Sequence, residues 1–115
     1  MRQFTDNLGR EWRVSFTIGH AESIKDLLGV DFLNILGDPA RSDEPPPLTR
    51  LATDYTLLAQ VTFILCEDQA KEQGIDQKQF YKALGGDAFR AAHEAVKGAL
   101  SDFFQSLGRD DVVEM

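Results

Sequence analysis

The side chains best suited to chemistry in this 115-residue chain are one cysteine, Cys66, and two histidines, His20 and His93. A cysteine and a histidine can form a nucleophile pair when the helices that carry them pack together. Cys66 lies among apolar neighbours, which raise the pKa of a thiol rather than lower it. Because no motif supplies an oxyanion hole or an orienting third group, we expect no catalytic residues, and a small enzyme using Cys66 and His93 remains an alternative.

Metal and cofactor sites are not predicted either. A zinc site needs about four ligands at suitable spacing, which His93, Cys66 and scattered carboxylates do not present. A single cysteine also excludes an internal disulfide. The chain has no glycine-rich phosphate-binding motif of the GxGxxG or GxxxxGK[ST] type. We therefore expect no metal, no cofactor and no small-molecule substrate.

The charge balance excludes further classes of function. The chain has 19 acidic and 12 basic residues, for a formal net charge of -7. A general nucleic-acid binder, or a protein that docks on an anionic membrane, needs an excess of lysine and arginine instead. The N-terminus has no apolar run of the secretory type, and no stretch reaches the roughly 18 apolar residues of a membrane span. The expected location is the cytoplasm, with neither nucleic acid nor membrane as a partner.

The N-terminal residues 3–18 predict a β-hairpin. Asp6-Asn7-Leu8-Gly9 has the composition of a turn. After it, apolar residues alternate with polar ones, which is typical of a half-buried strand. The residues predicted to share its apolar face are Trp12, Val14, Phe16 and Ile18. This face either covers the core or belongs to an edge strand offered to a partner.

The longest apolar helical pattern covers residues 48–74, and the fold is expected to be organised around it. Leu58, Val61, Thr62 and Leu65 are predicted to be its core positions. A helix with so narrow a polar stripe is normally covered by other elements. The segments predicted to cover it are the apolar face of the hairpin, residues 24–36 and the apolar stripe of a last helix that runs to about residue 107. Leu51 and Tyr55 are predicted to share the apolar face of the central helix.

Shorter patterns predict the helices around it, beginning with helical residues 20–36. In residues 20–28, Ile24, Leu27 and Leu28 are predicted to face inward. Asp76 and Gln79 form a capping-box pattern before a short helix, and Asp87 is placed to cap the last helix. The last helix has a predicted buried stripe, with Phe104 a little further round: Phe89, Ala92, Val96, Ala99, Leu100, Phe103 and Leu107.

These elements predict a mainly α (α+β) fold: an N-terminal hairpin followed by four to five helices around a central apolar helix. We expect a single domain over residues 1–115. A proline-rich linker covers residues 37–47, the helical bundle residues 48–107 and an acidic tail residues 108–115. Residues 30–36 fit a short helix, with a strand as the alternative. Apolar surface that the fold leaves uncovered would bind a protein partner or another copy of the chain. The candidate partner-binding residues are Trp12, Phe16, Phe63, Ile64, Phe103 and Phe104.

Three parts of the sequence resemble tail assembly chaperones encoded among the tail genes of phages and prophages. They are the opening FTDNLGREW, the segment GVDFL, and the stretch GIDQKQF followed by LGGDA. The likeness extends from Phe4 to Phe104. It implies a non-enzymatic protein of the bacterial host's cytoplasm. Such a protein keeps a long hydrophobic tape measure protein soluble and helps tail tube subunits to assemble around it. The alternative is a structural virion component, such as a connector or minor tail protein, that remains in the particle.

Overall fold

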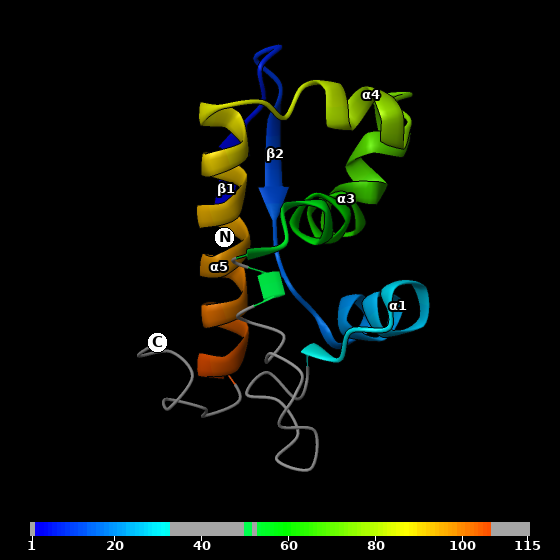
Figure 1. Cartoon of the computed structure of the whole chain (residues 1–115), viewed down its shortest axis with the longest axis vertical. Helices are drawn as coiled ribbons and strands as arrows, with labels where there is room; N and C mark the ends of the chain where they lie inside the picture. Colours follow the sequence, from blue (N-terminus) through cyan, green and yellow to red (C-terminus); the bar gives the residue numbers. More distant parts are fainter. Residues whose placement is uncertain (1, 33–49, 52, 107–115) are drawn as a thin grey trace.

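The computed structural model describes residues 2–32, 50–51 and 53–106 (Figure 1). These residues form two antiparallel strands and four helices, which confirms the predicted mainly α fold with an N-terminal hairpin. In chain order the elements are β1 (Arg2–Thr5), β2 (Glu11–Val14), α1 (Ile18–Leu28), α3 (Tyr55–Glu72), α4 (Gln77–Lys82) and α5 (Asp87–Ser106). Helix α5 runs alongside β1, whereas α3 packs against β2 and contacts all three other helices. The structure therefore confirms that the helix predicted from residues 48–74, here α3, lies at the centre of the fold.

Four predictions lie wholly or partly outside the described residues. They are the short helix or strand beyond residue 32, the linker 37–47, the start of the central helix at 48–49, and the tail 108–115.

The hairpin turn is organised by the carboxylate of Asp6, whose side chain is only 1% exposed. Its Oδ1 accepts hydrogen bonds from the backbone amides of Leu8 at 2.9 Å and Arg10 at 3.0 Å. Its Oδ2 accepts from Arg10 Nε at 2.8 Å and from Trp12 Nε1 at 2.9 Å. Burial is the largest single influence and would raise the pKa of Asp6. The hydrogen bonds from Trp12, Arg10 and Leu8 outweigh burial, and together they hold this pKa below its ordinary value.

The two strands place one apolar face on the helices, as predicted. Phe4 lies opposite Trp12 in the ladder. Trp12, Val14 and Phe16 are all buried. The predicted inward position of Ile18 is wrong, because β2 ends at Val14 and Ile18 begins α1 with 53% of its surface exposed. The two-residue alternation stops where the chain turns into a helix.

Helix α1 begins with a capping box in which a histidine takes the place usually held by Glu or Gln. The Thr17 hydroxyl accepts from the His20 amide, and His20 Nδ1 accepts from the Thr17 amide, both at 3.2 Å. Ile24 is buried against α3, as predicted, and Gly29 ends the helix in the left-handed region. The predicted inward position of Leu27 is wrong, since 69% of its surface is exposed. Helix α1 buries only the narrow face that carries Ile24, and Leu27 is rotated off it.

The central helix α3 begins seven positions later than the apolar pattern predicts, at Tyr55 instead of residue 48. Arg50 and Leu51 belong to a helical turn, in which the Asp54 amide donates to the Arg50 carbonyl at 2.8 Å. Asp54 then takes an extended conformation, and its side chain accepts from the Leu57 amide. An aspartate in this position starts a new helix, so the two helical stretches do not form one rod.

The middle of α3 forms the core as predicted. Its four predicted core residues, Leu58, Val61, Thr62 and Leu65, are all buried. Thr62 satisfies its hydroxyl by donating to the Leu58 carbonyl at 2.7 Å.

Beyond Gly74, Asp76 and Gln79 form the predicted capping box of α4. The hairpin tip docks onto the end of this helix, where the Asn7 amide donates to the Ala83 carbonyl at 2.9 Å.

Helix α5 starts at Asp87, which lies in the first turn instead of capping it. Ala92, Val96 and Leu100 of the predicted stripe are buried. Phe104, placed at the margin of the stripe by the sequence, is also buried. Phe89 is only partly buried, although the pattern predicts a core position. This difference leaves its ring beside an open groove.

Candidate functional site

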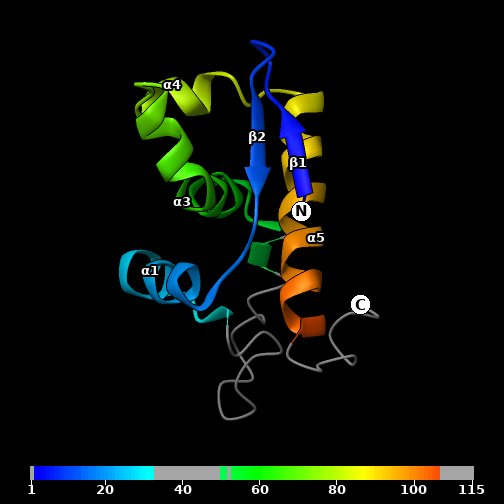
Figure 2. The ribbon, with the colours of Figure 1, turned by 180° about the vertical axis from the view of Figure 1, so that it is seen from behind.

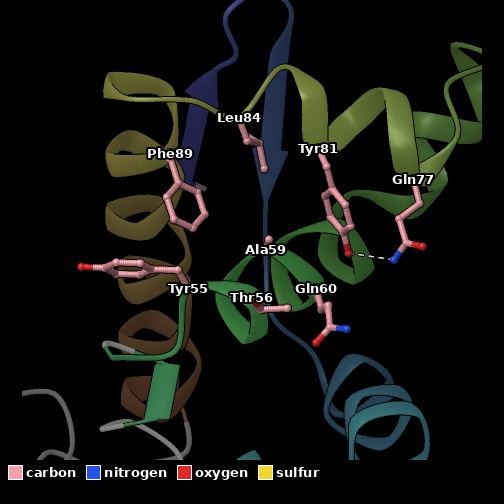
Figure 3. A pocket seen from close by; sticks show the side chains of 8 residues that line it. All are labelled: Tyr55, Thr56, Ala59, Gln60, Gln77, Tyr81, Leu84 and Phe89. Carbon is pink, nitrogen blue, oxygen red and sulfur yellow. Dashed lines mark hydrogen bonds between the residues drawn. The ribbon is translucent and has the colours of Figure 1, made fainter.

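An open groove of about 410 Å³ lies where α3, α4 and α5 meet (Figure 3). Aromatic and aliphatic side chains supply most of its walls: Tyr55 from α3, Tyr81 from α4, Leu84 from the following turn and Phe89 from α5. The remaining lining residues are small or uncharged polar side chains, namely Thr56, Ala59, Gln60 and Gln77. All eight lining residues lack a formal charge, in a chain where 27% of residues are charged.

Tyr55 is an exposed aromatic residue of the groove, with 67% of its surface accessible. It is the first residue of α3, directly after the capping residue Asp54. Its ring meets that of Phe89 edge to face, with centroids 5.8 Å apart. The cap at Asp54 therefore fixes where the ring of Tyr55 stands against α5.

The opposite wall of the groove contains a hydrogen bond between two lining side chains, which Figure 3 marks with a dashed line. Gln77 Nε2 donates to Tyr81 Oη at 2.7 Å. Burial raises the pKa of Tyr81, and the bond from Gln77 opposes that shift in part. Tyr81 is therefore a neutral phenol near neutral pH, and its hydroxyl can still donate a hydrogen bond to a bound group. This arrangement suits apolar side chains with an occasional polar group, and it offers no acid–base pair.

The predicted partner-binding residues divide into buried and partly buried sets. Trp12, Phe16 and Phe104 are respectively 0%, 6% and 1% exposed. All three are core residues, the alternative left open for the hairpin face, and Phe16 also lines a groove beside α5. Phe63 and Phe103 are partly buried and packed against the core.

Two further grooves are lined in part by predicted residues, namely Phe16 and Phe103 in one and Ile64 in the other. One, of about 350 Å³, lies between the end of β2 and α5 and is lined partly by Phe16 and Phe103, whose ring centroids are 5.1 Å apart. The other, of about 430 Å³, lies between α1 and α3, where Ile64 shares its walls with His20 and Asp68. Burial lowers the pKa of His20, partly offset by the negative charge of Asp68. The fold thus distributes the six predicted residues over several places and does not gather them into one site.

Sequence reasoning missed the groove between α3, α4 and α5 because it assigned Tyr55 and Phe89 to buried stripes. The available signal was Asp54, a preferred capping residue inside an apparently continuous helix. A break at Asp54 would have placed Tyr55 at a helix start, outside the core. Tyr81 and Leu84 carry no comparable signal, since their exposure depends on how far α4 stands from α5.

The Cys66–His93 nucleophile pair has no support in the geometry of Cys66. The thiol is fully buried, with Sγ 4.0 Å from the Arg13 carbonyl oxygen. Burial raises its pKa to about 12, so the reactive thiolate is scarce near neutral pH. Within residues 2–32, 50–51 and 53–106, no three His, Cys, Asp or Glu side chains are grouped to hold a metal ion.

In that same part of the chain, none of the helices is both long and apolar enough to cross a membrane. No family model, no curated protein and no solved structure matches this chain.

Proposed function

We propose that this protein is a non-enzymatic assembly chaperone or adaptor of the phage tail type. It holds an apolar helical segment of a client protein, similar to a tape measure protein, in the groove between α3, α4 and α5. The observation that carries the proposal is the solvent-accessible aromatic wall formed by Tyr55, Tyr81 and Phe89. The class of client comes from the resemblance of the sequence to tail assembly chaperones.

The size of the groove supports a helix that binds through its side chains. An α-helix about 11 Å across and 5.4 Å per turn occupies roughly 500 Å³ per turn. The groove has about 410 Å³ and is open to solvent, so it accepts the apolar side chains of one or two turns while the client's backbone stays outside. Helix-in-groove recognition uses such anchors at positions i, i+3, i+4 and i+7.

The chemistry of the lining supports the same kind of client. Its walls contain no charge that would need a counter-ion on the client. Aromatic rings contribute large contact areas for little loss of side-chain entropy. The net charge of -7 lies elsewhere on the chain and favours solubility of a complex that carries an apolar client.

Co-expression with a long, helix-rich client protein of the tape measure type tests the proposal. The wild-type chain should increase the soluble fraction of that client and co-purify with it. The variant Tyr55→Ala removes one groove wall at an exposed position, where effects on folding are small. Leu8→Ala is the matched control, because Leu8 is 71% exposed, lies in the hairpin turn and does not line the groove. Loss of co-purification in Tyr55→Ala but not in Leu8→Ala would support the groove, and equal behaviour of the two variants would refute it.

A chaperone and a structural tail component differ in their final location. Mass spectrometry of purified particles should find the client and none of this chain. A stoichiometric amount of the chain in finished particles would instead favour the connector or minor tail protein.

A further inference from the structure

The turn of the hairpin reaches the segment that joins two walls of the groove. Helix α4 supplies Tyr81, α5 supplies Phe89, and Leu84 lies between the two helices. Figure 2 shows the hairpin turn at the upper end of the molecule, where the chain passes from α4 to α5. Because this connection is short, the position of residues 83–86 sets how far α4 stands from α5.

Asn7 of the hairpin turn forms hydrogen bonds to the backbone on both sides of Leu84. Its own backbone amide donates to the Ala83 carbonyl at 2.9 Å. In the orientation that satisfies both polar atoms of its side chain, the oxygen accepts from the Gly85 amide at 3.1 Å and the nitrogen donates to the Gly85 carbonyl at 3.2 Å. A Cβ at position 85 would lie 3.1 Å from the Asn7 side-chain amide, so glycine lets this side chain approach the backbone closely.

These bonds connect the end of one helix to the start of the next. Ala83 is the C-terminal capping residue of α4. The Gly85 carbonyl also accepts from the Ala88 amide, in the first turn of α5, at 3.2 Å. A carbonyl oxygen has two lone pairs and can accept both bonds. Asn7 therefore links the last turn of α4 to the first turn of α5.

The turn that carries Asn7 is held in place by other contacts. The Gly9 amide donates to the Asp6 carbonyl at 3.1 Å, which closes a β-turn with Asn7 as its second residue. This bond does not use the amide of the second residue, which is left to reach α4. The hairpin also supports α4 through Trp12, whose ring meets that of Phe80 edge to face with centroids 4.9 Å apart.

From these contacts we propose that Asn7 is a positioning residue of the groove. It holds Leu84 in the wall and fixes the separation of α4 from α5, so that the hairpin turn determines how tightly the groove holds its client. Asn7 is exposed and does not line the groove, so it acts on a client only through the residues it holds. The effect on client binding rests on the proposed function, whereas the effect on Gly85 and Ala88 does not.

Amide hydrogen exchange of the full chain without a client tests the positioning directly. Asn7→Ala removes the two side-chain bonds and keeps the backbone bond to Ala83. The amides of Gly85 and Ala88 should then exchange roughly fivefold faster, since the net effect of one ordinary hydrogen bond changes an equilibrium constant by about that factor. Leu8→Ala is the matched control, because its side chain is 71% exposed in the same turn, and both amides should exchange as in wild type.

A second variant removes the backbone bond as well. Proline is favoured at the second position of a β-turn, so Asn7→Pro keeps the turn and loses the amide that donates to Ala83. Exchange at Gly85 and Ala88 should be faster than in Asn7→Ala.

The effect on binding is measured as the rate at which a co-expressed client of the tape measure type leaves the tagged chain during a chase with excess untagged wild type. Asn7→Ala should speed this dissociation roughly fivefold, whereas Leu8→Ala should not. Gly29→Ala controls for a general loss of stability. It places a side chain at φ 70° at the end of α1, which strains the backbone without altering the groove, and the dissociation rate should stay at the wild-type value.

Three results would overturn the inference. The first is unchanged exchange at Gly85 and Ala88 in both Asn7 variants, whatever the client does. The second is faster exchange with an unchanged rate of client dissociation. The third is faster dissociation that Gly29→Ala reproduces, because general instability would then explain it. A wild-type chain that holds no client refutes the proposed function instead, and the exchange measurement still decides whether Asn7 positions the segment between α4 and α5.

Discussion

Replacing Asp6 by alanine should produce the largest loss of stability available from a single polar side chain of the hairpin. The carboxylate is 1% exposed and accepts four hydrogen bonds from Leu8, Arg10 and Trp12. Removing it leaves the indole N–H of the fully buried Trp12 without its acceptor, and the Arg10 guanidinium loses the carboxylate with which it pairs. Breaking a buried ion pair by removing one partner costs about 3–5 kcal/mol. Against a total stability of about 5–15 kcal/mol, the loss is large.

Asp6→Asn separates the effect of charge from that of shape. The asparagine has the same outline, but its NH₂ group faces donors where Oδ2 had accepted bonds from Trp12 and Arg10. Its cost should therefore approach that of Asp6→Ala. Asp26→Ala, on the exposed surface of α1, is the control and should change stability by less than about 0.5 kcal/mol.

Urea unfolding followed by fluorescence measures these losses directly, because Trp12 is the only tryptophan. The pH dependence gives an independent check. Since the pKa of Asp6 is held below its ordinary value, the unfolded chain takes up the proton more readily than the folded one. Its stabilisation is complete above a pH of about 4 and is lost as the pH falls through the folded-state pKa. Asp6→Asn should lack this part of the acid dependence. A loss below about 1 kcal/mol in Asp6→Ala would refute the role assigned to the buried carboxylate.

Three further predictions concern α1, α5 and the buried thiol. Because the pKa of His20 is lowered in the fold, stability should decrease as the pH falls below about 6.5. His20→Gln, which keeps an acceptor for the Thr17 amide, should remove that decrease in pH-dependent urea unfolding, and an unchanged slope would contradict the assignment. In Gly98→Ala the added methyl group would displace the Arg2 side chain, because a Cβ at this position lies 2.7 Å from Arg2 Nε. The unfolding free energy should change by less than about 1 kcal/mol, because the gain in helix propensity offsets the loss of the exposed ion pair between Arg2 and Asp102. A loss above about 2 kcal/mol would mean that Arg2 cannot move aside. Cys66 should resist an aromatic disulfide reagent at a pH of about 8 in the folded protein and react quickly in urea, and rapid labelling without denaturant would contradict its burial.

Much of the fold can be predicted because local and global signals agree. The hairpin follows from alternating residues around Asp6 and Gly9, and both capping residues of α4 are visible in the sequence. The core of α3 follows from its helical periodicity, as the buried Leu58 and Val61 confirm.

The site is harder to predict because exposure depends on how elements are spaced. Periodicity shows that Tyr55, Phe89 and Leu27 lie on the apolar faces of their helices. Each of these faces is wider than the surface that the neighbouring elements cover. Tyr55 and Leu27 are consequently exposed, while Phe104 is buried at the margin of its stripe. Trp12 was a candidate for binding because the apolar face of the hairpin could have remained uncovered, yet the carboxylate of Asp6 accepts a hydrogen bond from its indole inside the core.

The central claim, that the groove between α3, α4 and α5 holds a client helix, is tested most directly by site-specific photo-crosslinking in the co-expressed complex. A benzophenone side chain at Tyr55 should crosslink to apolar client residues spaced three or four apart, as one face of a helix requires. The same probe at Leu8, which is similarly exposed at the hairpin tip, should give no such crosslinks. A client that co-purifies but crosslinks equally from both positions, or only from Leu8, would contradict the account.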